Sequence, residues 1–269
     1  MNIVCVIPAR YSSSRLPGKP LMNIAGKPMI WWVYQEAKKV RFFSEIYVAT
    51  ESAQIVERCQ ELDLNVILTS DKHPTGTDRV AEVAQKIMAD GYLIWMGDEP
   101  LITSREVEFL ISESLVHKDY FAYILGKPFD SAVDVVNSTT IKLAINKNKE
   151  LIFVSRSAIP FPKATLGFEY YKNIGAYLMT REALEFFLRV EIGLLEEIEE
   201  IEILRLLENH KKVYVALLKD SISMSVDTHK DLKRVCSLIR QSPYYTGGGG
   251  VNSSIPFTCN NYQPLLGVA

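Results

Sequence analysis

A short loop near the start of the chain concentrates groups that bind phosphate. It runs from Pro8 to Leu21 and gathers three cations and three hydroxyls, namely Arg10, Arg15 and Lys19 with Ser12, Ser13 and Ser14. Arginine forks onto phosphate oxygens, lysine adds a point charge, and small residues such as Ala9 and the serines let backbone N–H groups approach an anion. Neither a Walker A sequence nor a dinucleotide-binding glycine motif is present. We interpret the segment as a triphosphate-binding loop, and the alternative is a solvated basic turn.

Two aspartates are candidate metal ligands. Asp98 follows the apolar run from Tyr92 to Met96, and Asp227 follows residues 221–226. Mg²⁺ in proteins is typically held by one or two carboxylates together with substrate phosphates, so this pair is sufficient. Each aspartate has an ordinary alternative role. Asp98 could belong to a simple turn, and Asp227 could be the N-cap of the helix predicted after it.

A polar loop from His73 to Arg79 lies between these two signals in the sequence. Thr77 or Asp78 could cap the helix that follows it, and Arg79 could face a ligand. His73 is either part of the site or an ordinary histidine of a surface loop. The loop is therefore a candidate for nucleotide contact, with a structural role as the alternative.

The elements that must position these loops alternate between strands and helices in the first half of the chain. Strands are predicted over 3–7, 45–50, 65–69 and 92–96, with helices over 28–39, 53–62 and 78–90 between them. This rhythm predicts an α/β fold with a Rossmann-like, mostly parallel sheet, whose ligands bind at the carboxyl ends of the strands. Strand-like runs over 121–125, 140–145 and 151–155 follow one another with only turns between them, which predicts an antiparallel β insertion over about 121–180. Helices over 181–189, 195–209 and 228–241 and a strand over 213–218 complete the prediction.

Composition and charge narrow the class of protein. The chain has 269 residues, and its 30 Lys and Arg nearly balance 32 Asp and Glu, which argues against a non-specific nucleic-acid binder. The N-terminal apolar run is too short for a membrane span, so we expect a soluble, cytoplasmic protein with no membrane partner. Four widely spaced cysteines argue against a zinc ribbon or a disulfide framework. We predict one domain over 1–241 and an uncharged, glycine-containing tail over 242–269.

A run of glutamates from Glu196 to Glu202 raises the question of a metal site. Leu195, Ile198, Ile201 and Leu204 have helical spacing, which would place most of these carboxylates on the opposite, solvated face. We therefore predict solvent exposure for the run, except for Glu202, which lies nearest the apolar edge.

Six motifs occur together in a fixed order between about residues 2 and 240. They read P-A-R-Y-S-S-S-R-L-P-G-K-P-L, H-P-T-G-T-D-R, G-D-E-P-L-I, S-R-S-A-I-P, I-G-A-Y and S-V-D-T-H-K-D-L. In this order and at these separations they resemble the 3-deoxy-manno-octulosonate (KDO) cytidylyltransferases, which make CMP-KDO for lipopolysaccharide biosynthesis. The resemblance implies a nucleotidyltransferase fold that uses CTP and Mg²⁺, and a homodimer with the insertion as its contact.

The resemblance also assigns roles to individual residues. The triphosphate of CTP would be held by Arg10, Arg15 and Lys19, with Ser13 and Ser14 as supporting donors. Thr75 and Gly76 would lie against the cytidine, and Asp98 and Asp227 would bind the metal. On the acceptor side, Lys142 matches a lysine of the family's equivalent strand, Arg156 would meet the acceptor's carboxylate, and Glu202 would lie in the acceptor pocket.

Three positions of the acceptor pocket depart from the family pattern. Met96, Asn173 and Ile203 stand where the family has a glutamine, a histidine and a glutamine. Each unmet polar group on a bound sugar acid costs roughly 1–3 kcal/mol, so the pattern predicts cytidylyl transfer more firmly than it predicts KDO as acceptor. The acceptor is therefore a KDO-like 3-deoxy sugar acid or a modified relative, with a small acid such as a phosphonate as an alternative. A non-catalytic nucleotide-binding homologue is the alternative from another class.

Overall fold

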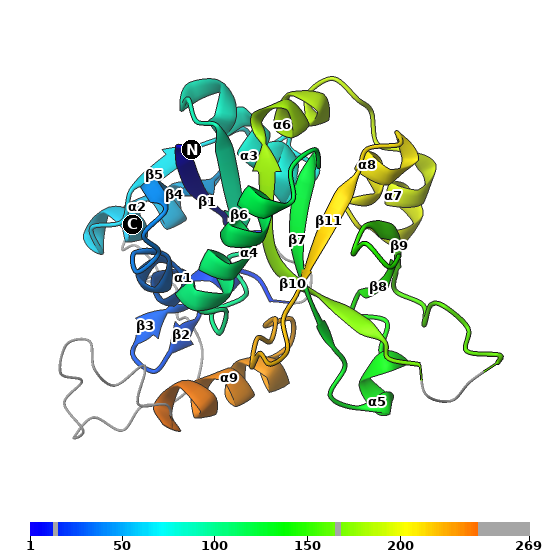
Figure 1. The fold of residues 1–269 in the computed structure, drawn as a ribbon. Coiled ribbons are helices and arrows are strands. Elements are labelled where there is room, and N and C mark those ends of the chain that lie inside the picture. Colours follow the sequence, from blue (N-terminus) through cyan, green and yellow to red (C-terminus); the bar gives the residue numbers. More distant parts are fainter. Residues whose placement is uncertain (13–15, 165–167, 242–269) are drawn as a thin grey trace.

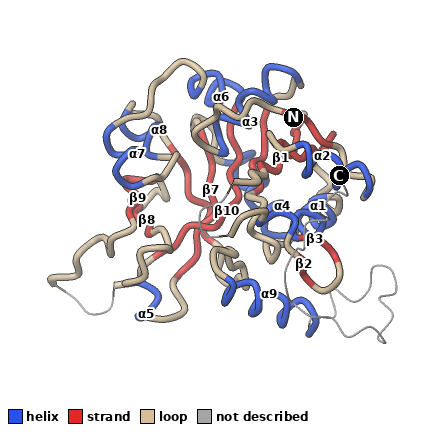
Figure 2. Tube along the Cα trace, turned by 180° about the vertical axis from the view of Figure 1, so that it is seen from behind, coloured by secondary structure: helices blue, strands red, loops and turns tan. Residues whose placement is uncertain are grey.

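The computed structural model describes residues 1–12, 16–164 and 168–241 and places one large sheet between layers of helices (Figures 1 and 2). Its strands follow the order β11-β7-β10-β6-β1-β4-β5, and a β8–β9 hairpin branches from β10. The bounds are β1 Ile3–Pro8, β4 Phe43–Thr50, β5 Val66–Leu68, β6 Gly91–Trp95, β7 Ala122–Pro128, β8 Lys142–Ile145, β9 Leu151–Ser155, β10 Tyr171–Thr180 and β11 Val213–Leu217. A separate short pair consists of β2 Asn23–Ile24 and β3 Lys27–Pro28.

Most neighbouring strands of the central path are parallel, and one long strand reverses the direction. β1 pairs in parallel with β4 and β6, β4 with β5, and β7 with β11. β10 runs antiparallel to β6, β7 and β8. The mostly parallel sheet and the antiparallel insertion that the sequence predicts are therefore confirmed, and the insertion contributes two strands to the central sheet.

Helices cover both faces of the sheet because its central strands are apolar on both sides. In β1, Ile3, Cys5 and Ile7 belong to one core cluster, whereas Val4 and Val6 belong to a second one. The first cluster includes residues of α1 Met29–Ala37, α2 Ala53–Glu61 and α4 Ser104–Val116, and the second includes residues of α3 Gly76–Lys86, α6 Arg181–Phe187 and α8 Leu204–Glu208. Continuous apolar runs of this kind are typical of strands buried between two helical layers.

The remaining helices lie at the ends of the sheet. They are η1 Lys19–Leu21, α5 Ala132–Val135, α7 Leu194–Glu199 and α9 His229–Gln241. α9 packs through Leu232, Val235 and Ile239 in a third cluster with Ile24 and Met29. No helix in the described ranges is long and apolar enough to cross a membrane. The boundary between the domain and the tail stays a prediction, because residues 242–269 lie outside the described residues.

Two helix boundaries differ from the sequence prediction. The helix expected over 195–209 is two helices, α7 and α8, because Glu200 adopts a left-handed backbone conformation with φ of 51° and ends α7. The helix expected from Asp78 begins at Gly76, and its cap is Thr75 rather than Thr77 or Asp78. The Thr75 side chain accepts a hydrogen bond from the Asp78 N–H at 3.1 Å, which satisfies one of the free donors at the helix start.

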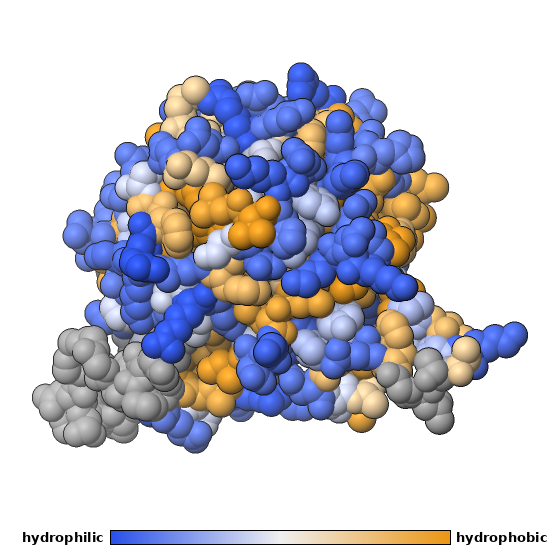
Figure 3. All heavy atoms as spheres, viewed as in Figure 1, coloured by the Kyte–Doolittle hydropathy of each residue, from blue (hydrophilic) through white to orange (hydrophobic). Residues whose placement is uncertain are grey.

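The prediction that the glutamate run faces solvent is wrong for Glu196. Its side chain is buried, whereas Leu194 and Ile198 on the same helix are 67% and 69% exposed. The physical reason is Arg205, whose buried guanidinium requires carboxylates inside the protein. Figure 3 accordingly shows apolar side chains at the surface over the part of the molecule that contains α7.

Candidate active site

One lysine and two aspartates meet where β1 and β6 end. Lys19 Nζ lies 2.7 Å from Asp98 Oδ2 and 3.2 Å from Asp227 Oδ1, and all three side chains are partly exposed. We call these residues the Lys19 triad. The sequence predicts that all three belong to one site, and the structure brings them into contact although 208 positions separate Lys19 from Asp227.

The ends of two strands carry these carboxylates to the same place. Gly97 follows β6, and a Cβ there would lie 2.9 Å from the Pro8 carbonyl oxygen at the end of β1, so only glycine allows the close approach. The Val226 N–H donates to the Asp98 carbonyl oxygen at 2.9 Å and so holds the next residue, Asp227, beside Asp98.

A different residue provides the cap that the sequence offered as an alternative role for Asp227. Thr228 precedes α9, and its hydroxyl oxygen accepts from the Asp231 N–H at 3.3 Å. Asp231 in turn accepts from the Thr228 N–H at 2.8 Å. Because this pair satisfies the start of α9, the Asp227 carboxylate remains available for the site.

The electrostatics of the triad fit a divalent cation with phosphate ligands. Burial alone would lower the pKa of Lys19, but the charges of Asp98 and then Asp227 outweigh burial and raise the pKa. The adjacent Glu99 is buried, and burial followed by the charge of Asp98 raises its pKa to about 8. Among the described residues no cluster of three or more Asp, Glu, His or Cys side chains forms a complete metal site. Two carboxylates suffice for Mg²⁺ when substrate phosphates supply further oxygens.

The phosphate-binding loop and the 73–79 loop lie against each other. Arg10 Nη1 donates to the Pro74 carbonyl oxygen at 3.1 Å, so this exposed arginine joins the two loops. The Ala9 N–H is already used, because it donates to the Ala49 carbonyl oxygen at 2.9 Å. Three residues predicted to bind nucleotide, Ser13, Ser14 and Arg15, lie outside the described residues.

Side chains of α3 hold the 73–79 loop in place. Glu82 accepts from the Ser70 N–H at 2.9 Å and lies 2.5 Å from His73 Nε2. Arg79, which could have faced a ligand, is buried, bonds Thr69 and the Ser70 carbonyl oxygen, and pairs with Glu51 at 2.8 Å. His73 and Arg79 therefore have structural partners, and Thr75 and Gly76 are the residues of this loop next to the acceptor side.

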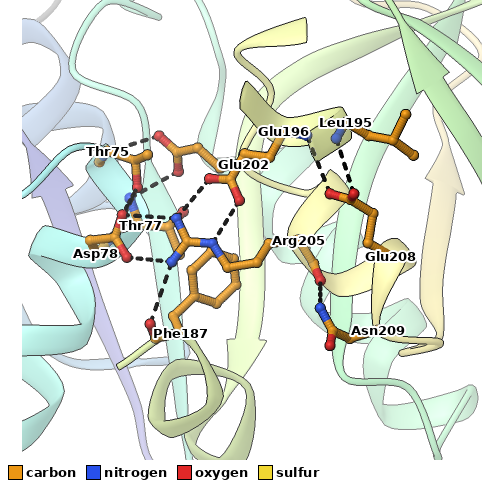
Figure 4. A network of polar contacts seen from close by, with 11 residues as sticks. Thr75, Thr77, Asp78, Phe187, Leu195, Glu196, Glu202, Arg205, Glu208 and Asn209 are labelled. Atoms are coloured by element: carbon orange, nitrogen blue, oxygen red, sulfur yellow. Dashed lines mark hydrogen bonds and ion pairs between the residues drawn. The ribbon is translucent and has the colours of Figure 1, made fainter. Parts of the chain in front are cut away.

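A buried arginine connects α3 to α7 and α8 (Figure 4). Arg205 forks onto Glu196 at 2.6 and 2.7 Å and onto Asp78 at 2.7 and 3.1 Å, and its guanidinium carbon lies 4.5 Å from the centre of the Phe187 ring. We call Arg205, Asp78 and Glu196 the Arg205 triad. Beside it, Glu202 accepts from the N–H groups of Gly76 and Thr77 at 2.8 and 2.9 Å. Glu202 thus binds the start of α3, where a negative charge is favourable.

A cavity of about 140 Å³ lies between this network and the sheet. Four of the six residues predicted to bind the acceptor line it, namely Met96, Asn173, Glu202 and Ile203. Met96 stands two residues before Asp98, so the cavity adjoins the Lys19 triad. The structure therefore places the predicted acceptor pocket next to the predicted metal ligands.

The other two predicted acceptor residues are not in the cavity lining. Lys142 is buried, and its Nζ donates to the carbonyl oxygens of Asn137 and Arg156, both at 2.6 Å. Arg156 Nε donates to the Glu199 carbonyl oxygen at 2.7 Å, and its two terminal nitrogens donate to those of Ser138 and Glu200 at 3.3 Å. In this arrangement both cations fasten loops to the hairpin, and their roles toward an acceptor stay predictions.

Sequence reasoning missed several residues of this region. Thr77 and Tyr177 line the cavity, and Arg205 and Glu196 hold its wall. Tyr177 stands in the I-G-A-Y motif and Thr77 in H-P-T-G-T-D-R, so the motifs contained a signal for both. For Arg205 the chain offers no local signal, because its partner Asp78 is 127 positions away.

A family model described as cytidylyltransferase matches residues 4–215. The chain belongs to the cytidylyltransferase family. The KDO cytidylyltransferase of Thermodesulfovibrio yellowstonii is 37% identical over 247 residues, which are 87% of this chain and 96% of the relative. The 8-amino-3,8-dideoxy-manno-octulosonate cytidylyltransferase of Shewanella pealeana is 36% identical, with 88% and 97% covered. The resemblance that the motifs indicated is confirmed.

Solved structures of related cytidylyltransferases and other nucleotidyltransferases share the fold. A CMP-KDO synthetase in complex with CTP superposes with a TM-score of 0.85 at 35% identity and covers 90% of this chain and 99% of its own. A glucose-1-phosphate thymidylyltransferase from Bacillus anthracis superposes with a TM-score of 0.67 at 18% identity, with 89% and 96% covered, which shows the fold alone. The predicted nucleotidyltransferase fold is therefore confirmed.

Proposed function

We propose that the protein transfers CMP from CTP to a KDO-like 3-deoxy sugar acid or a modified relative and releases pyrophosphate. The observation that carries this proposal is the contact of Lys19 with Asp98 and Asp227 beside the cavity lined by Met96. Relatives named for KDO and for its 8-amino derivative, and a neighbour complexed with CTP, support it. The cavity explains why a separate acceptor can lie next to the phosphates.

The reaction is attack of an acceptor oxygen on the α-phosphorus of CTP, with pyrophosphate as the leaving group. Lys19 and Arg10 would stabilise the negative charge that develops on the phosphates, since preformed cations need little reorganisation during the reaction. Asp98 and Asp227 would hold Mg²⁺, which when bound neutralises phosphate charge and orients the leaving group. Lys19 holds both carboxylates in the ligand-free protein, so we expect the metal to bind mainly together with CTP.

The experiment is a pyrophosphate-release assay with purified protein, Mg²⁺, CTP and KDO. We expect release that requires both CTP and an acid, and much slower release with UTP, ATP or GTP. The matched control is the Lys38→Met variant, which removes an exposed lysine of the α1 end and should behave as the wild type. Absence of pyrophosphate release with every nucleotide and acid, from a protein that still binds CTP, would favour the non-catalytic homologue.

We also propose that the protein is a homodimer whose contact is the insertion over 121–180. Ile152 and Phe161 of this segment are 61% and 84% exposed, and exposed apolar groups of this size support a protein contact. Light scattering during size-exclusion chromatography should give twice the mass of 30.5 kDa. A monomeric mass at micromolar concentration would refute this arrangement.

A further inference from the structure

The acceptor cavity has a mainly apolar wall. The side chains that form this wall come from four strands and from the turn between α7 and α8, and they are Ile124, Ile141, Val154, Met179, Ile201 and Ile203. A volume of about 140 Å³ is far larger than the roughly 10–15 Å³ that one water needs, so the cavity has the size of part of a ligand. An inference about that ligand rests on the function proposed above.

Two polar atoms of the cavity residues lack hydrogen-bond partners among the described residues. They are Thr77 Oγ1, on a residue with no exposed surface, and Asn173 Oδ1. Buried polar atoms in native proteins almost always have partners, so these two atoms indicate a polar ligand group that is missing from the ligand-free protein. Asn173 Nδ2 donates to Tyr177 Oη at 2.7 Å, which leaves the tyrosine proton to donate to a ligand.

The acidic residue of the cavity is already committed. Both carboxylate oxygens of Glu202 accept from backbone N–H groups at the start of α3, at 2.8 and 2.9 Å. Glu202 therefore has less capacity to accept from several sugar hydroxyls. The polar capacity of the cavity is thus concentrated at Thr77, Asn173 and Tyr177, and the opposite wall offers none.

We propose that the natural acceptor is a 3-deoxy-2-keto acid whose chain ends in an apolar, deoxygenated segment. The polar part of this acid would meet Thr77, Asn173 and Tyr177, and its apolar end would lie against Ile124, Ile203 and their neighbours. A chain that carries a hydroxyl on each terminal carbon would lose water at this wall without gaining a partner. A charged terminal amine would lose even more.

The direct test compares acceptors with the wild-type protein. KDO, 8-deoxy-KDO and 8-amino-KDO are supplied with CTP and Mg²⁺, and kcat/KM is measured for each acid. We expect 8-deoxy-KDO, which ends in a methyl group, to exceed KDO at least 10-fold and 8-amino-KDO by more. Equal or better use of KDO or of the amino acid would overturn this inference and leave CMP transfer intact. No CMP transfer to any acid would overturn the proposed function and this inference with it.

A second test removes the uncommitted hydroxyl. Thr77→Val keeps the shape of the side chain, so we expect an unchanged or higher thermal midpoint, a KM for the acid raised about 10-fold and an unchanged KM for CTP. Ile203→Gln should shift the ratio of kcat/KM toward KDO about 10-fold, whereas the matched Ile203→Met should keep the wild-type ratio. A Thr77→Val protein with an unchanged KM for the acid, or an Ile203→Gln protein with an unchanged ratio, would contradict the assignment.

Discussion

Two regions of the molecule each combine one cation with two carboxylates, and they differ in how accessible these charges are. In the Lys19 triad the side chains are 14–23% exposed, and Lys19 contacts each carboxylate through a single nitrogen. In the Arg205 triad the side chains are 2–11% exposed, and Arg205 forks onto both partners. Equal numbers of charges therefore produce an adjustable group at one place and a fixed one at the other.

The difference follows from the chemistry of the two cations. A lysine ammonium is a compact point charge on a flexible chain, whereas the planar guanidinium binds two carboxylates at once in a fixed geometry. Lys19 can move from the aspartates to a phosphate, which leaves the aspartates for a metal. Arg205 has no such freedom, because its release would leave Asp78 and Glu196 charged and buried. The Lys19 triad thus suits chemistry, and the Arg205 triad holds the acceptor wall against α3.

The largest expected effect is on stability at the Arg205 triad. Arg205→Met removes the cation from two buried carboxylates, and breaking a buried pair in this way typically costs about 3–5 kcal/mol. Urea unfolding measures the loss of free energy. The control is Arg181→Met, because Arg181 pairs with Glu185 at the surface and its removal should change stability little. Equal midpoints for the Arg205 variant and the wild type would break the comparison.

The Lys19 triad should respond in activity and hardly in stability. Lys19→Met removes a charge that faces the phosphates, so we expect turnover to fall about 10²–10³-fold. The free energy of unfolding should change by less than about 1 kcal/mol, because the ion pairs are partly exposed. Pyrophosphate release and urea unfolding are measured on the same preparation. A stability loss as large as that of Arg205→Met would mean that the two triads do not differ.

A smaller effect separates a metal ligand from a helix cap. Asp227→Asn should raise the Mg²⁺ concentration for half-maximal turnover about 10-fold, because it removes one of two carboxylates. The matched Asp231→Asn variant, which perturbs the start of α9, should leave the metal requirement unchanged. An unchanged requirement in Asp227→Asn would leave Asp227 without the role assigned to it.

The smallest effect concerns the acid limb of stability. Burial would raise the pKa of Glu82, but hydrogen bonds from Lys86, His73 and the Ser70 N–H outweigh it and lower the pKa to about 2. This carboxylate therefore stabilises the fold above its ordinary pKa of 4.5, and the contribution is lost as the pH falls toward 2. Thermal midpoints of Glu82→Gln should lie below those of the wild type at pH 7 and converge with them near pH 3. A constant difference between pH 7 and pH 3 would contradict this.

The fold could be predicted from the sequence because its signals are local. The apolar run from Ile3 to Ile7 is buried on both faces, and the polar loops follow the strand ends as parallel sheets require. Lys19 and Asp98 could be predicted for the same reason, since each follows a strand of the parallel sheet. Order along the chain and the geometry of the sheet were enough for these residues.

The rest depends on contacts that no local pattern contains. Leu195 and Ile198 have the spacing of a buried helix face, yet they are exposed because Glu196 on another face is needed by Arg205. The break at Glu200 depends on the same requirement, since Arg205 must reach Asp78 of α3. Lys142 and Arg156 have the expected residue types, but their nitrogens are bound to backbone carbonyl oxygens.

The most direct test of the account is ³¹P NMR of one sample that contains the protein, CTP, Mg²⁺ and a 3-deoxy-2-keto acid. We expect the CTP signals to be replaced by those of pyrophosphate and of a CMP phosphodiester, and the phosphodiester to be absent when the acid is omitted. CTP that stays intact with every acid, or that yields free CMP without a phosphodiester, would contradict the claim that the Lys19 triad and the adjoining cavity together transfer CMP to an acceptor.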